Sequence, residues 1–341
     1  MKIMIDIGHP KDVNVFKNII LTLIKNGHEI KIVARAKENT EMIIKDHGFS
    51  CEYGPYYKSI IGKVIGIPIN DIWLYKIAKK FKPDIFISPG SPYSAHVSKI
   101  LGKPHYAFID TEIATLATNL MLPFTDKIYT SSSYYIDLGL KQVRFNGYYE
   151  LSYLHPKYFT PEEKVLDNYG LKKEEYIILR LSALASHHDI NASGFSFKNE
   201  KELSSYIHEL EKYGRVIISS EKNNWDIIKK YQLRFQSKDL HHILYFAKMY
   251  IGEGASMASE AAILGTPAIY VSNTRRGYLN ELEEKYELVY SISGREEALM
   301  KSIKILEGDY KKIWHEKRER MLHEKTDVVR YIVDSIESYY N

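Results

Sequence analysis

Short apolar runs alternate along the chain with segments whose apolar residues recur at helical spacing. The run Lys2–Gly8 predicts a buried strand, and the residues after it that share one helix face are Val13, Phe16, Ile20, Leu23 and Ile24. Gly27 is predicted to cap this helix, and Ile30–Ala34 predicts the next strand. A strand, a helix and a strand in this order predict a parallel sheet with right-handed crossovers.

The same alternation continues through the first half of the chain. Further strands are predicted at Asp84–Gly90, His105–Asp110 and Lys127–Ser132, with a helix at Ser94–Gly102. The region Tyr57–Ile69 contains two glycines and a proline, and we interpret it as a flexible loop outside the sheet.

A second alternating series follows a change of pattern at Asn146–Gly170, which has two prolines and no clear strand. The later strands are predicted at Tyr176–Ser182, Arg215–Ser220, Met249–Gly252, Ala268–Val271 and Leu288–Ile292, and two polar helices at about Asp309–His323 and Thr326–Tyr340. We therefore predict an α/β chain of two doubly wound Rossmann-like domains, residues 1–155 and 156–325, that face a cleft. Ligands of such sheets bind at the carboxyl ends of the strands.

Composition and charge narrow the class of protein. The 341 residues allow two domains, and 45% hydrophobic residues fit a globular core. A net charge of +4, with lysines mixed among acids, argues against a nucleic-acid partner but suits an anionic small molecule. The single Cys51 excludes a disulfide framework within the chain and argues against a cysteine zinc site. Asp6 interrupts the first apolar run and no run of about 18 apolar residues occurs, so we expect a cytoplasmic protein.

The segment Ile251–Val271, "IGEGASMASEAAILGTPAIYV", carries the clearest chemical pattern. Gly254 allows a tight turn and close approach of a ligand, and Ser256 is predicted to be the helix N-cap. The free N–H groups of a helix N-terminus bind anions such as phosphate. The segment therefore predicts a phosphate site after a strand.

Glu260 lies inside this helix among alanines. A capping box fits poorly because Glu260 follows Ser256 by four residues, not three. A solvated helix position is a second interpretation, although the neighbours are small and apolar. In the third interpretation the carboxylate accepts hydrogen bonds from two vicinal hydroxyls of a sugar.

This segment resembles the signature of the GT-B superfamily of nucleotide-sugar enzymes. The resemblance implies that Glu260 binds the nucleotide ribose, and that Gly254, Ala255, Ser256 and Met257 meet the diphosphate. Many relatives have a second glycine where this chain has Ala255. Asp6–Arg35, with the Gly8-His9-Pro10 loop, and His155–Pro161 are similar to the same enzymes.

Taken whole, the chain resembles an uncharacterised archaeal and bacterial family related to UDP-N-acetylglucosamine 2-epimerases and GT-B glycosyltransferases. The resemblance implies that the last helix crosses back, so that residues 326–341 join the first domain. It also implies a UDP-sugar as substrate and no required cofactor, and the chain has no Asp-x-Asp motif for a metal.

Two candidates for acid–base chemistry follow predicted strands of the first domain. His9 is either a solvated loop residue or a cleft residue that meets the sugar or acts as a base. Asp110 and Glu112 follow the strand His105–Asp110, where Asp110 or Thr111 could instead cap a helix. Glu112 matches the catalytic Glu of an epimerase His-x-Glu-Ala-Gly segment, but no His or Gly matches beside it.

The second domain adds candidates at two more strand ends. Ser182, His187 and His188 follow the first strand, where epimerases carry His-Arg-Arg-Glu-Asn and this chain has no arginine pair. The histidine pair with Asp189 is a thin metal signal, since Asp239–Ile243 is predicted to be helical and distant. Arg275 and Arg276 follow the strand Ala268–Val271 and either neutralise a diphosphate or belong to a plain surface loop.

Our leading hypothesis is a nucleotide-sugar-dependent glycosyltransferase of glycan or polysaccharide biosynthesis. A sugar epimerase and a non-catalytic nucleotide-sugar-binding protein are the alternatives. The acceptor, a sugar or a lipid-linked molecule, stays open, as do a peripheral membrane contact and a homodimer.

Overall fold

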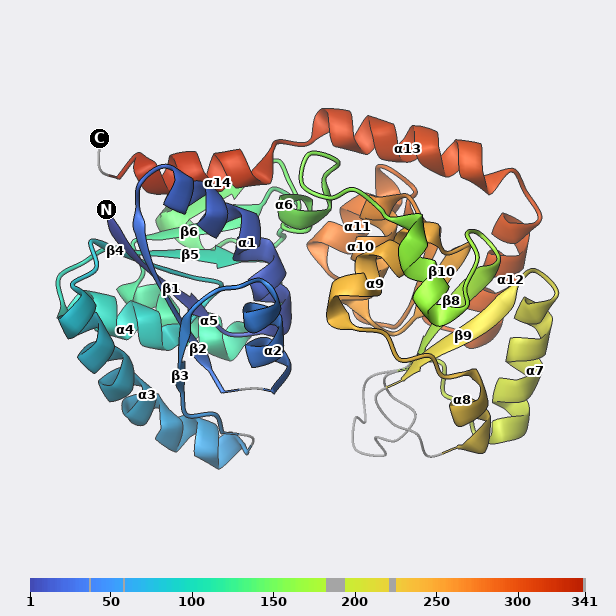
Figure 1. The fold of residues 1–341 in the computed structure, drawn as a ribbon, viewed down its shortest axis with the longest axis horizontal. Coiled ribbons are helices and arrows are strands. Elements are labelled where there is room, and N and C mark those ends of the chain that lie inside the picture. Colours follow the sequence, from blue (N-terminus) through green and yellow to red (C-terminus); the bar gives the residue numbers. More distant parts are fainter. Residues whose placement is uncertain (37, 58, 182–193, 221–224, 340–341) are drawn as a thin grey trace. The chain divides into compact units, whose positions relative to one another are not determined.

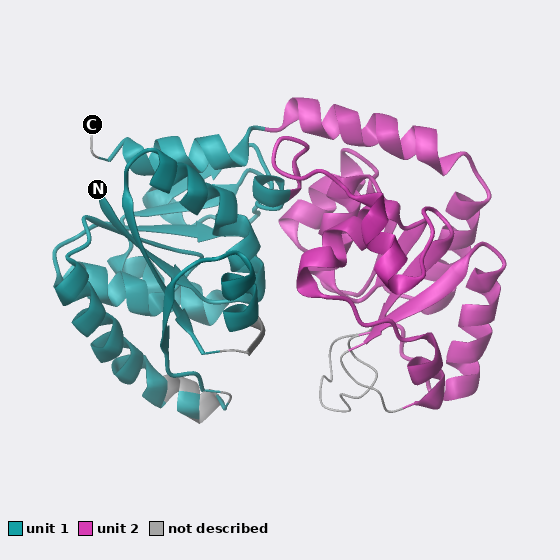
Figure 2. Cartoon of the chain, in the orientation of Figure 1, with its two compact units in different colours: residues 1–153, 326–341 teal, residues 154–325 magenta. Residues whose placement is uncertain are grey.

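The computed structural model describes residues 1–36, 38–57, 59–181, 194–220 and 225–339. The chain divides into two compact units (Figure 2). Unit 1 comprises Met1–Tyr153 with Thr326–Asn341, and unit 2 comprises Leu154–Lys325.

Unit 1 contains a parallel sheet of seven strands in the order β3-β2-β1-β4-β5-β6-β7 (Figure 1). The strands are β1 Lys2–Ile7, β2 Glu29–Arg35, β3 Cys51–Gly54, β4 Ile85–Ser88, β5 His105–Ile109, β6 Lys127–Ser131 and β7 Gln142–Phe145. The helices are α1 Pro10–Lys25, α2 Glu38–Asp46, α3 Ile60–Phe81, α4 Pro92–Ile100, α5 Thr115–Met121, α6 Leu151–Leu154 and α14 Val328–Glu337, with 3₁₀ turns η1 Leu122–Phe124 and η2 Gly139–Lys141. The strand order reverses between β1 and β4, which is where such sheets bind ligands.

The C-terminal helix α14 packs against α1, so the last residues of the chain belong to unit 1. Its buried side is apolar and includes Val329, Ile332 and Ile336. The Thr326 N–H donates to the Asn146 carbonyl at 2.9 Å just before the helix begins. This confirms the predicted return of the C-terminal helix.

The prediction of a loop at Tyr57–Ile69 is wrong, because α3 begins within it. The Ser59 hydroxyl accepts from the Gly62 N–H at 3.0 Å and caps the helix. A Cβ at Gly66 would lie 2.4 Å from the Tyr57 ring, so this glycine makes room for an aromatic packed on the helix. The helix tolerates Pro68 in its interior.

Unit 2 contains a parallel sheet of five strands in the order β12-β11-β10-β8-β9. The strands are β8 Tyr176–Leu181, β9 Arg215–Ser220, β10 Met249–Gly252, β11 Ala268–Val271 and β12 Val289–Ile292. The helices are α7 Glu200–Glu211, α8 Asp226–Tyr231, α9 Leu240–Phe246, α10 Ala255–Leu264, α11 Gly277–Glu284, α12 Arg295–Leu306 and α13 Tyr310–Glu324, with 3₁₀ turns η3 Glu163–Tyr169 and η4 Ser237–Asp239. Helices α9, α10 and α11 contact in series, and α12 contacts α7, as in a doubly wound fold.

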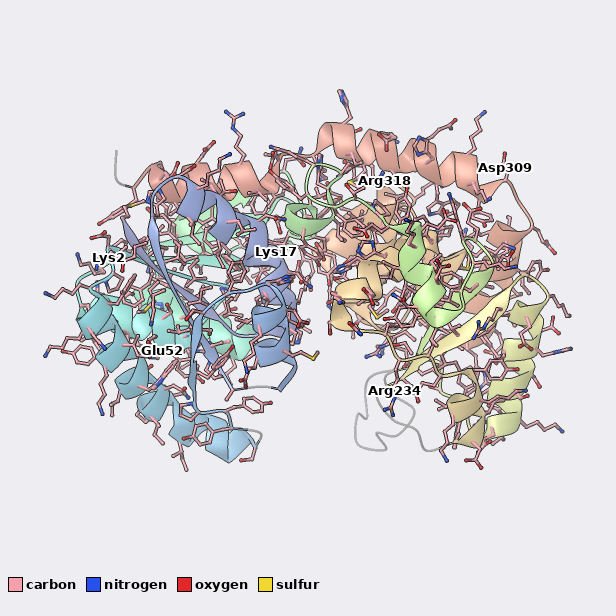
Figure 3. The ribbon with its side chains drawn as sticks, viewed as in Figure 1. Lys2, Lys17, Glu52, Arg234, Asp309 and Arg318 are labelled. Carbon is pink, nitrogen blue, oxygen red and sulfur yellow. The ribbon has the colours of Figure 1, made fainter. Side chains whose placement is uncertain are left out.

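Helix α13 holds the C-terminal end of α10. Arg318, labelled in Figure 3, donates from Nε to the Ile263 carbonyl at 2.9 Å. Gly265 ends α10 at φ +86°, and a Cβ there would lie 2.7 Å from Arg318 Cδ. A glycine is therefore required both by backbone conformation and by this contact.

A buried histidine makes unit 1 sensitive to acid. His105 is fully buried, with Nδ1 2.9 Å from Thr125 Oγ1 and Nε2 2.9 Å from Ser88 Oγ. The Thr125 hydroxyl donates to the Met121 carbonyl, so Nδ1 carries the proton and the ring is neutral. Burial, helped by the positive charge of nearby His96, lowers the pKa of His105 to about 3.

We expect this neutral histidine to cost stability as the pH falls. Protonation is penalised in the folded state only, so the free energy of unfolding should fall by up to about 1.4 kcal/mol per pH unit from pH ~6.5 towards ~3. Urea unfolding at several pH values checks this. His105→Gln keeps a donor and an acceptor and should flatten the slope; an unchanged slope in the variant would assign the acid sensitivity elsewhere.

Candidate functional site

The N-terminus of α10 begins directly after β10, at the point where the strand order of unit 2 reverses. Gly254 is the N-cap and offers no side-chain hydrogen bond, so the prediction that Ser256 caps the helix is wrong. Ser256 is instead the second residue of the helix. The first-turn amides of Ala255, Ser256 and Met257 are therefore not covered by a side chain of the N-cap residue, which leaves the geometry that binds anions.

Two side chains fix the approach to this turn. A Cβ at Gly252 would lie 2.5 Å from Arg180 Cβ and 2.6 Å from Tyr250 Oη. Tyr250 Oη donates to the Gly254 carbonyl at 3.1 Å, and Arg180 Nη1 donates to Ser219 Oγ at 2.9 Å. Neither residue was among the sequence candidates, because both lie within predicted strands and the candidates were taken from the loops that follow the strands.

Glu260 is buried, with 4% of its surface exposed, and faces the α9 helix. His241 Nε2 lies 3.3 Å from Glu260 Oε1. A solvated position and a capping box are therefore both wrong as explanations of this acid. The segment Asp239–Ile243, which the sequence analysis set aside, supplies its partner.

The loop after β11 is ordered by Arg276 rather than Arg275. Arg276 Nη1 donates to Tyr270 Oη and to Thr274 Oγ1, each at 2.9 Å. Arg275 is exposed and lies 3.3 Å from Glu283. Arg275 as a phosphate ligand stays a prediction, and Arg276 is the arginine held at the end of the strand.

Unit 1 gathers charged side chains at the carboxyl ends of β1 and β5. Lys11 Nζ lies 2.6 Å from Asp110 Oδ2 and 3.0 Å from Glu150 Oε1, and its side chain is only 10% exposed. Burial acts to raise the pKa of Asp110, but the charge and hydrogen bond of Lys11 outweigh it and leave the pKa below its usual range. The sequence analysis missed Lys11 and Glu150.

Gly8 and His9 form the turn into α1. Asp12 Oδ2 accepts from the N–H of Gly8 at 3.2 Å and of His9 at 2.7 Å, and His9 Nδ1 accepts from the Lys11 N–H at 3.3 Å. His9 is exposed, as the solvated interpretation expects, and it is also the N-cap of α1. Because Nδ1 accepts a hydrogen bond, the neutral ring carries its proton on Nε2 and can donate from there. Its role as a base stays a prediction.

Asp12, in the first turn of α1, is an acid with a strongly raised pKa. Burial, followed by the negative charge of Asp110, raises the pKa of Asp12 to about 7. The side chain is half-buried by surface area, so solvent offsets part of the burial effect. Asp12 can therefore exchange a proton near neutral pH.

We expect NMR titration of the Asp12 carboxyl carbon to show an inflection near pH 7. Asp110→Asn removes the like charge and should move the inflection down, whereas Lys11→Met removes a positive charge and should move it up. Ionisation is disfavoured in the fold, so this acid's contribution to stability is full below pH ~3.8 and is lost as the pH rises through 7. Shifts of equal sign in the two variants would contradict this assignment.

Glu112 is buried, 3% exposed, and Oε1 accepts from the Tyr135 N–H at 3.4 Å. The following helix α5 begins at Thr115 with Ala114 as N-cap and no side-chain cap bond. Capping by Asp110 or Thr111 is therefore wrong. Asp110 pairs with Lys11, and Glu112 lies at the same strand end in a buried position.

A buried ion pair in the same sheet connects β1, β2 and the turn that follows β4. Asp6 on β1, fully buried, pairs with Arg35 on β2 and accepts a hydrogen bond from Ser91, which follows β4. Arg35 donates from Nη2 to the Ile7 carbonyl at 3.2 Å, and its guanidinium carbon lies 5.1 Å from the Tyr93 ring centre. The pair fixes the point where the strand order reverses.

Ser182, His187 and His188 lie outside the residues that the structure describes. Within the described residues, no group of three or more His, Cys, Asp or Glu side chains is placed to hold a metal ion. None of the helices in this described part of the chain is long and apolar enough to cross a membrane.

Two doubly wound parallel units with a returning C-terminal helix define a protein of GT-B fold. The chain belongs to the family described as "Protein of unknown function (DUF354)", whose model matches residues 1–341. It is similar to the uncharacterized protein MJ0665 of Methanocaldococcus jannaschii, at 22% identity over 289 residues, 79% of this chain and 81% of that protein.

Solved structures share the fold over the whole chain. The UDP-GlcNAc 2-epimerase of Neisseria meningitidis, bound to UDP-GlcNAc, superimposes with a TM-score of 0.71 at 12% identity, covering 99% of this chain and 100% of that one. The spinosyn forosaminyltransferase SpnP gives a TM-score of 0.64 at 12% identity, covering 99% of each chain. Enzymes of two reaction types therefore share this fold.

Proposed function

We propose that the protein is an enzyme that binds a nucleotide-sugar, with a UDP-sugar as the first choice, at the N-terminus of α10. The observation that carries this proposal is the uncapped first turn of α10 at the strand-order reversal of unit 2, with Glu260 buried one turn further on. The amides of Ala255, Ser256 and Met257 would take the diphosphate. The Glu260 carboxylate, held by His241, would take the ribose hydroxyls.

Glycosyl transfer is the reaction we favour. The α10 N-terminus would stabilise the departing diphosphate, which is the group that gains negative charge in the transition state. The acids of unit 1 would supply the base for an acceptor hydroxyl, with Asp12 and Glu112 as candidates. His9 would serve as a hydrogen-bond donor.

Epimerisation of the sugar is the second candidate. It is favoured by the position of the buried Glu112 at the end of β5 and by the epimerase structures that share the fold. The segment Ser182–Gly194 has no arginine pair where epimerases carry His-Arg-Arg-Glu-Asn, and this is the reason for ranking epimerisation second. Neither reaction as proposed uses a metal.

Thermal denaturation in the presence of a panel of nucleotides and nucleotide-sugars tests the proposal. We expect one nucleoside diphosphate and its sugar conjugates to raise the melting temperature, since a ligand that binds only the folded state stabilises it. The protein is then incubated with the stabilising donor, alone and with sugar or lipid-linked acceptors, in the presence of EDTA. The products are identified by mass spectrometry and NMR.

The products distinguish the candidates. Free nucleotide with a glycosylated acceptor supports transfer, and a rearranged donor without acceptor supports epimerisation. Binding with no product in either reaction would leave a binding protein and overturn the enzymatic proposal. If no nucleotide shifts the melting temperature, the proposed donor site is wrong.

A further inference from the structure

Helix α3 exposes a continuous apolar side on unit 1. Ile65, Ile69 and Ile72 are 58%, 42% and 57% exposed, and Pro68 between them is also exposed. Residues spaced by three, four and seven positions lie on one side of a helix. The same side continues towards the C-terminus of α3 with exposed Lys76, Lys79 and Lys80.

The opposite side of α3 is fixed in the core, so the helix cannot turn its isoleucines inward. Leu74 and Ala78 are fully buried and pack with Met4 and Phe86 of the sheet. A Cβ at Gly54 would lie 2.7 Å from the Trp73 ring, so that ring is pressed against the end of β3. A helix that is apolar on its outward side as well as on its buried side needs a partner that covers the outward side.

Helix α3 packs beside α4, which in turn contacts α5 and η1. Figure 1 shows α3 beside α4. His96 on α4 has Nδ1 3.0 Å from Asp71 Oδ2 on α3 and Nε2 3.3 Å from the Leu120 carbonyl oxygen on α5. The His96 ring also lies 4.9 Å from the Phe124 ring. Leu116, one turn before Leu120, is 69% exposed and Phe124 is 38% exposed. An exposed apolar side such as that of Ile65, Ile69 and Ile72 marks an interaction site when it is continuous.

The charge of this region indicates what the partner is. Residues 56–82 contain six lysines and one aspartate, a net charge of +5, whereas the whole chain has +4. The aspartate is Asp71, which is engaged by His96. Cores of protein–protein interfaces are depleted in lysine, whereas helices that lie on membrane surfaces combine an apolar side with lysines. Helix α3 itself, Ile60–Phe81, carries four of these lysines and the aspartate, a net charge of +3 on the helix that exposes its isoleucines.

We propose that the outward side of α3 docks on the surface of an anionic lipid bilayer. Ile65, Ile69 and Ile72 enter the boundary between headgroups and acyl chains, and Lys76, Lys79 and Lys80 meet the lipid phosphates. The protein is peripheral in this state, held by one helix lying along the interface. The inference does not depend on the nucleotide-sugar site of unit 2.

Vesicle co-sedimentation tests this surface. We expect the protein to sediment with vesicles of phosphatidylcholine and phosphatidylglycerol in equal amounts, to stay in solution with phosphatidylcholine alone, and to be released by high salt. Ile69→Asp with Ile72→Asp, and separately Lys76→Glu with Lys79→Glu, should each weaken sedimentation by about tenfold or more. Leu140→Asp, at a fully exposed leucine elsewhere on unit 1, is the matched control and should bind as wild type.

Each variant is first checked for an unchanged melting temperature, and the oligomeric state is measured without lipid by analytical ultracentrifugation. Loss of binding in both variants but not in the control supports the proposal. Sedimentation that all variants share with the wild type would overturn it. The proposal would also be overturned if the wild type binds no vesicles and forms a dimer without lipid that the variant Ile69→Asp with Ile72→Asp dissociates. The exposed side of α3 would then be a contact between two copies of the chain.

Discussion

Replacing Asp6 by alanine is expected to lower the free energy of unfolding by about 3–5 kcal/mol. Asp6 is fully buried, and its carboxylate holds both Arg35 and Ser91. Removal of the acid leaves the guanidinium of Arg35, itself only 7% exposed, without its counter-charge in a buried position. Urea unfolding followed by circular dichroism measures the change.

Two further variants separate this ion pair from general effects of charge. Glu52→Ala breaks the exposed pair with Lys31 and should cost less than about 1 kcal/mol (Figure 3 labels Glu52). Asp6→Leu combined with Arg35→Met removes both charges and should recover most of the loss. An Asp6→Ala variant no less stable than Glu52→Ala would show that the pair does not hold the three strands.

Replacing Glu260 by glutamine is expected to weaken nucleotide binding by about 1.5–3 kcal/mol, or roughly 10- to 150-fold in Kd. The carboxylate oxygens accept two hydroxyl protons in the proposed complex, and the amide of glutamine keeps the size but only one accepting oxygen. Isothermal titration of the stabilising nucleotide measures the loss. Arg275→Ala, at an exposed arginine, gives the comparison for a charge at the loop after β11.

The buried contact with His241 requires a check on the folded state. Glu260→Gln should still melt in one cooperative transition. The same nucleotide concentration should raise its melting temperature by less than it raises that of the wild type. A variant that melts at a lower temperature but binds nucleotide with unchanged affinity would make Glu260 a structural partner of His241. The ribose assignment would then be wrong.

The strands that the sequence predicted well are the inner strands of both sheets and also the edge strands β9 and β12 of the second sheet. Parallel strands covered on both sides read as unbroken apolar runs, as in Met249–Gly252. The strands that were missed, β3 and β7, lie at the two edges of the first sheet and are partly exposed. Their four residues include polar side chains, so they carry no such run.

The local part of the site was predictable and the long-range part was not. The glycine turn and helix at Gly254–Leu264 follow from neighbouring residues, although Gly254 rather than Ser256 proved to be the cap. Lys11 meets Glu150 only because the fold joins residues 139 positions apart, and His241 reaches Glu260 from a different helix. No periodicity or motif in the sequence predicts either of these contacts.

Hydrogen exchange of the α10 backbone, measured by mass spectrometry with and without UDP, tests the central proposal most directly. If the nucleotide binds as proposed, UDP will slow exchange at Ala255, Ser256 and Met257, and Glu260→Gln will need a higher UDP concentration for the same protection. Protection confined to other segments would place the nucleotide site elsewhere in the chain. If none of UDP, ADP, GDP and dTDP protects α10, a nucleotide-sugar site on this helix is contradicted.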